Sequence, residues 1–99
     1  MIKTFRHKGI QAFFENGSKA KIKATHTGKL RLQLAALHSA ASVADLATPV
    51  NWRLHQLKGQ NPKGQNVEGH YAFDVTGNWR LTFFFEGVDV VLVDYLDYH

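Results

Sequence analysis

Residues 70–96 read HYAFDVTGNWRLTFFFEGVDVVLVDYL and carry the strongest structural signal in the chain. Apolar and polar side chains alternate in three runs, as they do in half-buried strands. The runs are His70–Val75, Trp79–Phe85 and Val88–Leu96. Thr76-Gly77 and Glu86-Gly87 separate the runs and are typical of tight turns. We therefore predict three consecutive antiparallel strands.

Two shorter strand signals and a loop precede this segment. Ile2–Phe5 and Trp52–Leu57 alternate apolar with polar residues, and each predicts a strand. In the second of these, Trp52 and Leu54 should point one way, and Arg53 and His55 the other. The polar segment 58–67 contains two glycines and a proline, which predicts a mobile loop.

The first half of the chain has helical periodicity. Ile10, Phe13 and Phe14 predict a helix over Lys8–Asn16, and Gly17 stands where a terminating glycine belongs. A second helix should begin at a capping Thr25 or Thr27. Its apolar stripe should face the core and consists of Leu30, Leu34, Leu37 and Ala41. The whole pattern predicts one α+β domain over residues 1–99, with two N-terminal helices on one face of a small antiparallel sheet and the other face partly open.

Composition narrows the class of protein. Of the 99 residues, 44% are apolar and 20% are charged, which is ordinary for a soluble globular domain. No apolar run approaches the about 18 residues of a membrane span, and the N-terminus has no secretory signal. Cysteine is absent, which excludes disulfides and thiolate zinc sites. We therefore expect a cytoplasmic protein with no membrane partner.

Charge is distributed unevenly. Residues 1–64 hold eleven of the twelve lysines and arginines, whereas residues 65–99 hold six of the eight acidic residues. A basic region favours a polyanion such as nucleic acid or the ribosome. A solvated cationic surface is the alternative interpretation.

Two residues stand out as candidates for chemistry. If the helices cover the tryptophan face of the sheet, His55 and Arg80 share the open face. Imidazole is suited to proton transfer, and guanidinium is suited to holding a phosphate. Alternatively, His55 hydrogen-bonds locally and Arg80 pairs with Asp74 or Asp97. The histidines at 7, 26 and 38 lack metal-ligand spacing and are expected to be surface polar residues.

The sequence ends in Asp97-Tyr98-His99, which places a carboxylate, a phenol and an imidazole together directly after an apolar strand. With LHQLKG at 54–59 and GNWRLTF at 77–83, this ending resembles the HigB-type toxins of the RelE/ParE superfamily, from bacterial type II toxin–antitoxin systems. The start, MIKTF followed by His7-Lys8-Gly9, also fits that family. The resemblance implies two helices on an antiparallel sheet, in agreement with the pattern above.

The resemblance also implies an activity: a metal-independent endoribonuclease, without cofactor, that cleaves messenger RNA in the ribosomal A site. Its catalytic residues would fall on His55, Asp97, Tyr98 and His99. Arg80 would contact phosphate, and further RNA contacts are available from Arg53, Lys58 and Lys63. The two histidines at 55 and 99 can share acid and base work, and the sequence leaves open which does which. Tyr98 is better suited to stacking or phosphate positioning than to acting as the base.

The implied partners are the 70S ribosome, messenger RNA and a helix-turn-helix, HigA-like antitoxin, with operator DNA contacted only through the antitoxin complex. Two other functions compete on the same fold: a ParE-like inhibitor of DNA gyrase, and a non-catalytic RNA-binding module. The chain departs from the family in two places. The loop Gly59–Gly69 is longer than in close relatives, and Asp74 stands where relatives often carry neutral or basic residues.

Overall fold

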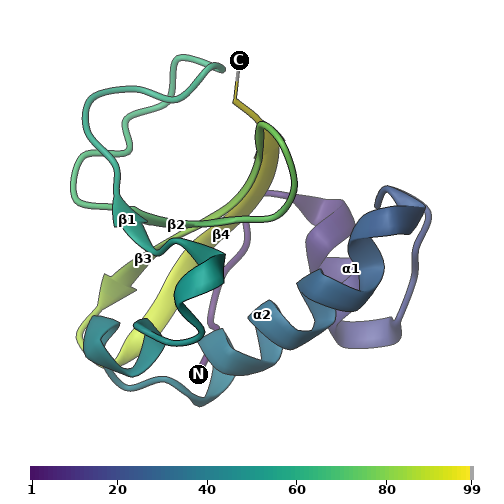
Figure 1. Ribbon diagram of the computed structural model, residues 1–99, viewed down its shortest axis with the longest axis horizontal. Coiled ribbons are helices and arrows are strands. Elements are labelled where there is room, and N and C mark those ends of the chain that lie inside the picture. Colours follow the sequence, from purple (N-terminus) through teal and green to yellow (C-terminus); the bar gives the residue numbers. More distant parts are fainter. Residues whose placement is uncertain (99) are drawn as a thin grey trace.

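The fold is seen in a computed structural model, which describes residues 1–98 (Figure 1). The helices and strands are α1 Lys8–Asn16, α2 Thr27–Ser39, β1 His55–Gln56, β2 Tyr71–Asp74, β3 Trp79–Glu86 and β4 Asp89–Asp97. Short 3₁₀ turns lie at Ala24–His26, Val43–Leu46 and Val50–Trp52. The longest helix in this part of the chain, α2, has 13 residues, and none there is long and apolar enough to cross a membrane.

The four strands form an antiparallel sheet in the order β1-β2-β3-β4. The three predicted runs become β2, β3 and β4, so the meander is confirmed. The segment Ile2–Phe5 forms no strand among the described residues. It makes two isolated parallel bridges to β4, at Val90 and Val93. These bridges cover the first half of the β4 edge.

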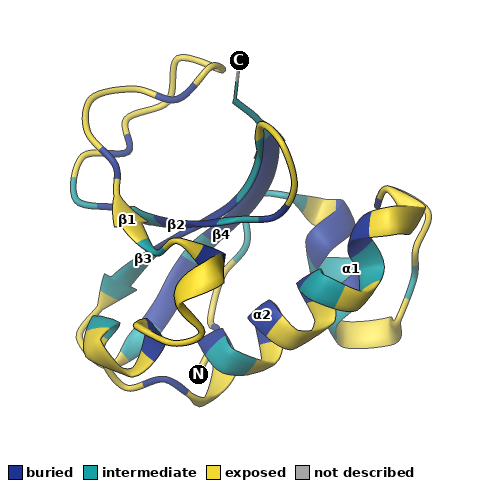
Figure 2. Cartoon of the chain, viewed as in Figure 1, coloured by how far each residue is buried: buried dark blue, intermediate teal, exposed yellow. Residues whose placement is uncertain are grey.

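The two faces of the sheet are covered differently. Both helices lie on one side, and the loop between β1 and β2 stands on the other (Figure 1). The main core lies on the helix side and includes Leu30, Leu37, Leu81, Phe83 and Val93. Figure 2 shows the buried stripe of the sheet running between the helices and this loop. On the other face a small second cluster, Leu57, Val67 and Ala72, packs under the loop. This cluster covers only part of that face, which is therefore partly open, as predicted.

Helix α1 has the predicted bounds. The His7 Nδ1 accepts a hydrogen bond of 3.0 Å from the Ile10 N–H and so caps the first turn. Gly17 adopts a left-handed φ of 75° and donates to the carbonyls of Ala12 and Phe13. Only glycine adopts this conformation without a steric penalty, which explains why the helix ends there.

Helix α2 differs from the prediction at both ends. The Thr27 hydroxyl donates to the Ala24 carbonyl instead of capping, and no side chain caps the helix, which is entered from a 3₁₀ turn. The predicted capping role of Thr25 or Thr27 was therefore wrong. The helix stops at Ser39 because the Ala41 N–H donates to Asp45 Oδ2, which belongs to a capping box that starts the next turn. Ala41 is consequently exposed and outside the apolar stripe.

Strand β1 is shorter than predicted. Trp52 ends a 3₁₀ turn, and its ring packs against Phe73 with 5.0 Å between ring centroids. Arg53 then takes a left-handed φ of 53°, which breaks the extended backbone. Within β1, His55 and Gln56 are therefore the two residues that pair with β2.

The segment predicted to be a mobile loop has its own hydrogen bonds, centred on Asn61. The Asn61 Oδ1 accepts from the N–H groups of Lys63 and Gln65 at 2.9 and 3.0 Å, and its Nδ2 donates to Gln65 Oε1. Gly59 donates to the Glu68 carboxylate at 3.0 Å, which ties the two ends of the loop together. The loop is therefore a defined structure that places Lys63 beside the sheet.

Candidate functional site

The register of the sheet determines which side chains share the open face. Residues opposite one another on antiparallel strands project to the same side. One row consists of His55, Ala72, Thr82 and Asp94, and the next consists of Asp74, Arg80 and Leu96. Ala72 belongs to the cluster under the β1–β2 loop, so both rows face away from the helices. His55 and Arg80 therefore lie on one face, as predicted.

These two residues line one pocket of about 290 Å³, together with Arg53, Leu54 and Asp74. The Asp74 carboxylate lies between two guanidinium groups, with Nε of Arg53 and Nε of Arg80 each 3.0 Å from one of its oxygens. Arg80 Nη1 also donates to the carbonyls of Gly77 and Trp79, at 2.8 and 3.1 Å. The Arg80 side chain is 21% exposed and doubly held, whereas that of Arg53 is 78% exposed. The pocket thus has one rigid and one adjustable cation.

The His55 ring has a defined tautomer. Its Nδ1 lies 2.7 Å from the Arg53 carbonyl and 4.0 Å from Asp74 Oδ1. A carbonyl can only accept, so Nδ1 carries the proton and donates. In the neutral ring, Nε2 then has a free lone pair. The site therefore holds a proton acceptor beside two guanidinium groups, and both alternatives raised by the sequence, the local hydrogen bond and the Arg80–Asp74 pair, are present.

Tyr98 lies on the same face. Its N–H donates to the Asn78 carbonyl at 2.8 Å, and its ring packs against Leu57, Val67 and Ala72. The phenol oxygen is buried and has no hydrogen-bond partner among residues 1–98. Burial raises the pKa of the Tyr98 phenol above its ordinary value of 10.0, with a further rise from a nearby carboxylate. The phenol is therefore protonated at neutral pH and can donate.

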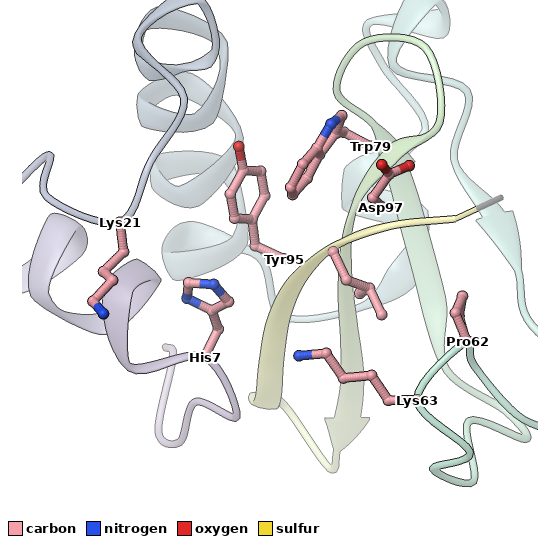
Figure 3. Close-up of a pocket in the computed structure, with 8 residues that line it drawn as sticks. His7, Lys21, Pro62, Lys63, Trp79, Tyr95 and Asp97 are labelled. Carbon is pink, nitrogen blue, oxygen red and sulfur yellow. The ribbon is translucent and has the colours of Figure 1, made fainter.

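Asp97 lies in a different place. It is opposite Trp79, on the helix side of the sheet, and lines a second pocket (Figure 3). Lys63 lines that same pocket, whereas Lys58 is exposed at the start of the loop. The structure thus brings His55, Arg80 and Arg53 into one pocket, with Tyr98 on the same face of the sheet, and places Asp97 and Lys63 in the other pocket. His99, the remaining predicted catalytic residue, lies outside the described residues.

Of the three histidines predicted to be surface residues, His38 is exposed, His7 is half-buried and His26 is buried, and all three make hydrogen bonds that support the fold. His26 is buried, and its two ring nitrogens lie 2.6 Å from the hydroxyl oxygens of Tyr95 and Thr76. His7 caps α1, and His38 Nδ1 accepts from the Ile2 N–H at 3.2 Å. The partners of His26 and His38 are distant in sequence, and the His7 cap depends on how its ring is oriented. The spacing of the histidines therefore gave no signal for these contacts.

Sequence reasoning also missed Arg6. Its Nη2 donates to the Asn66 carbonyl at 3.4 Å, which places the guanidinium under the β1–β2 loop. Burial lowers the pKa of the His70 imidazole, and the positive charge of Arg6 lowers it further. Burial raises the pKa of the Tyr98 phenol, and the charge of Arg6 partly opposes that rise. Arg6 follows a segment that merely bridges β4, and no pattern in the sequence marks it.

Comparison with known proteins places the chain in a family. The family model described as RelE-like toxin of type II toxin–antitoxin system HigB matches residues 3–99. The chain is also similar to the protein named Endoribonuclease HigB from Proteus vulgaris, with 34% identity over 99 residues that cover all of both chains. The match extends over both pockets and both helices, and the chain therefore belongs to the HigB family of RelE-like toxins of type II toxin–antitoxin systems.

Proposed function

We propose that this toxin is a metal-independent endoribonuclease that cleaves messenger RNA in the ribosomal A site and so arrests translation. One observation carries the proposal: the His55 imidazole, with a free lone pair on Nε2, shares a pocket with the guanidinium groups of Arg53 and Arg80. The name of the Proteus vulgaris relative supports the endoribonuclease class.

In this mechanism His55 is the base. Its Nε2 takes the proton of a ribose 2′-OH while the 2′-oxygen forms a bond to the adjacent phosphorus. The bond from phosphorus to the 5′-oxygen breaks, and an acid protonates the departing oxygen. The products are a 2′,3′-cyclic phosphate and a 5′-hydroxyl. The resemblance to the family places His99 and Asp97 among the catalytic residues; with His55 as the base, we assign the acid to the His99 imidazole, and Asp97 can orient an imidazole or help to take the proton.

The cations stabilise the charge that develops on phosphorus. Arg80 is held by two carbonyls, so its remaining N–H groups are preorganised for a phosphate oxygen. The exposed Arg53 can follow the RNA. Asp74 occupies the two guanidinium groups in the free protein, and an RNA phosphate would compete with that carboxylate for them. Tyr98, kept protonated by burial, donates to the phosphate or lies against a base.

The small size and the exposed cations of the toxin favour the ribosome and RNA as partners. A domain of 99 residues offers little area to hold a flexible message in line for attack, so a larger surface such as the 70S ribosome should position the RNA. Lys58, Lys63 and Arg53 provide cations for messenger or ribosomal RNA. We further propose that a helix-turn-helix antitoxin neutralises the toxin and contacts operator DNA in the complex.

The experiment that tests this function compares three substrates for the purified toxin: message on translating ribosomes, the same RNA alone, and supercoiled DNA with gyrase. We expect strong cleavage on ribosomes, weak cleavage of free RNA and no effect on gyrase. Equal cleavage with and without ribosomes would disprove the ribosome requirement. Inhibition of gyrase without RNA cleavage would favour the ParE-like alternative, and binding without cleavage would favour the RNA-binding module.

A further inference from the structure

The second pocket lies at the β4 edge of the sheet and is built from five separate parts of the chain. It has a volume of about 330 Å³ and is formed by the residues before α1, the α1–α2 connection, the β1–β2 loop and the ends of β3 and β4. Its lining residues are His7, Lys21, Pro62, Lys63, Trp79, Tyr95, Leu96 and Asp97. Figure 3 shows Lys21 and His7 on one side and Lys63 on the other, its ammonium pointing across toward His7.

The chemistry of this pocket suits an anion. His7 Nδ1 accepts from the Ile10 N–H, so the neutral ring carries its proton on Nε2 and offers a donor. Burial lowers the pKa of His7; the Asp94 carboxylate opposes this, and the positive charges of Lys63 and Lys21, which line the same pocket, lower it further. The opposing charges come from two carboxylates, Asp97 in the pocket and Asp94 nearby.

A third ammonium group lies near the pocket, beside the Trp79 ring that lines it. Lys23 Nζ lies 5.5 Å from the centre of the Trp79 ring, and the same ring stacks on Tyr95 with 4.7 Å between ring centroids. Because Tyr95 and Lys23 already contact the Trp79 ring, the pocket is better suited to a phosphate than to a stacked base. Among the lining residues two lysines stand against one carboxylate, so the pocket is cationic.

The second pocket also lies close to the His55 site, although the two have separate linings. Leu96 lines it and is the direct register partner of Arg80, whose guanidinium lines the His55 pocket. Opposed residues in an antiparallel pair have Cα atoms about 5 Å apart. The two isolated bridges from the N-terminal segment to β4 stop at Val93, within the part of the chain that the structure describes, so they do not cover the edge beside Leu96. A strand of RNA bound at Arg80 can therefore turn around this edge of β4 and bring a neighbouring phosphate to the second pocket.

We propose that this pocket, formed by His7, Lys21 and Lys63, binds a backbone phosphate of RNA next to the one cleaved at His55. The inference rests on the proposed nuclease function and adds a second anchoring point to it. Lys63 reaches the pocket from the β1–β2 loop, which its own hydrogen bonds hold in place. The phosphate belongs either to the message or to ribosomal RNA.

The test removes one charge at a time and uses a matched control. Lys21→Gln and Lys63→Gln each remove an ammonium group from the pocket, whereas Lys19→Gln removes one from the same connection outside it. All three side chains are exposed, so the variants should keep the wild-type melting temperature. Binding is measured over a range of salt concentrations, to a 2′-O-methyl RNA oligonucleotide that cannot be cleaved and to ribosomes with an empty A site.

We expect Lys21→Gln and Lys63→Gln to weaken binding roughly three- to tenfold at low salt. The slope of log K against log salt should fall by about 0.7, the value for one phosphate contact on a single strand. A loss with the oligonucleotide identifies a message phosphate, and a loss with ribosomes alone identifies ribosomal RNA. If both variants match Lys19→Gln in affinity and slope while wild type still cleaves message, the pocket inference is overturned and the nuclease stands. If wild type does not cleave, the proposed function itself fails.

Discussion

Two histidines on opposite sides of the sheet show how differently one side chain is used. His26, on the helix side, is 2% exposed and hydrogen-bonded at both ring nitrogens to Tyr95 and Thr76. His55, on the open side, fixes one nitrogen on a carbonyl and leaves the other free beside two arginines. The fully bonded ring is committed to the fold, and only the half-bonded ring has a lone pair for chemistry. Substitutions at the two positions should therefore affect different properties.

The largest effect should come from His55→Gln. Removing the base that accepts the 2′-OH proton should reduce cleavage on ribosomes by about 10²–10⁴-fold. The side chain is exposed, so the melting temperature should stay close to that of wild type. Cleavage is measured by primer extension on translated message, and folding by circular dichroism. A folded variant that cleaves at the wild-type rate would contradict the role of His55.

His26→Ala should have the reverse effect. It leaves a cavity against Trp79 and Tyr95, whose ring centroids lie 5.7 and 5.9 Å from the imidazole, and removes two hydrogen bonds. We expect the free energy of unfolding to fall by about 2–4 kcal/mol, measured by urea denaturation. Cleavage per folded molecule should stay near wild type, because His26 lies on the other side of the sheet. A variant of unchanged stability would show that the buried network contributes little.

The same contrast explains which features the sequence could predict. Alternation and turn residues located β2, β3 and β4, and apolar spacing with Gly17 located α1, because these signals are local. Strand parity also put His55 and Arg80 on one face. It could have separated Asp97 from Tyr98 as well, since neighbours in a strand point to opposite sides.

Other features depend on contacts between distant segments. The bonds of His26 join the start of α2 to Tyr95, 69 positions later, and no spacing rule reports them. Strand β1 was overestimated because Trp52 and Leu54 alternate as in a strand, whereas Arg53 adopts a left-handed conformation. The ion pairs of Asp74 were foreseen only as an alternative, because pairing depends on which arginines the fold brings to that strand.

The smallest expected effect is a dependence of stability on pH. Burial is the largest cause of the lowered pKa values of His26, His7 and His70, with nearby lysines or Arg6 adding to it. The ordinary value is 6.5, so between that pH and the lower native values the unfolded chain binds more protons than the folded one. Stability should therefore rise with pH through this window and fall on acidification, by at most about 1.4 kcal/mol per pH unit for each histidine.

Urea denaturation of wild type between pH 5.5 and 7.5 measures this slope while staying above the ordinary range of the carboxylates, about 4. In His26→Gln the side chain no longer titrates, and the amide can still bond to the Tyr95 and Thr76 hydroxyls. The slope should become shallower while part of the stability at pH 7.5 is kept. An equal slope in both proteins would mean that His26 binds protons equally in the folded and the unfolded chain. Burial on the helix side would then leave its pKa no different from that of a solvent-facing histidine.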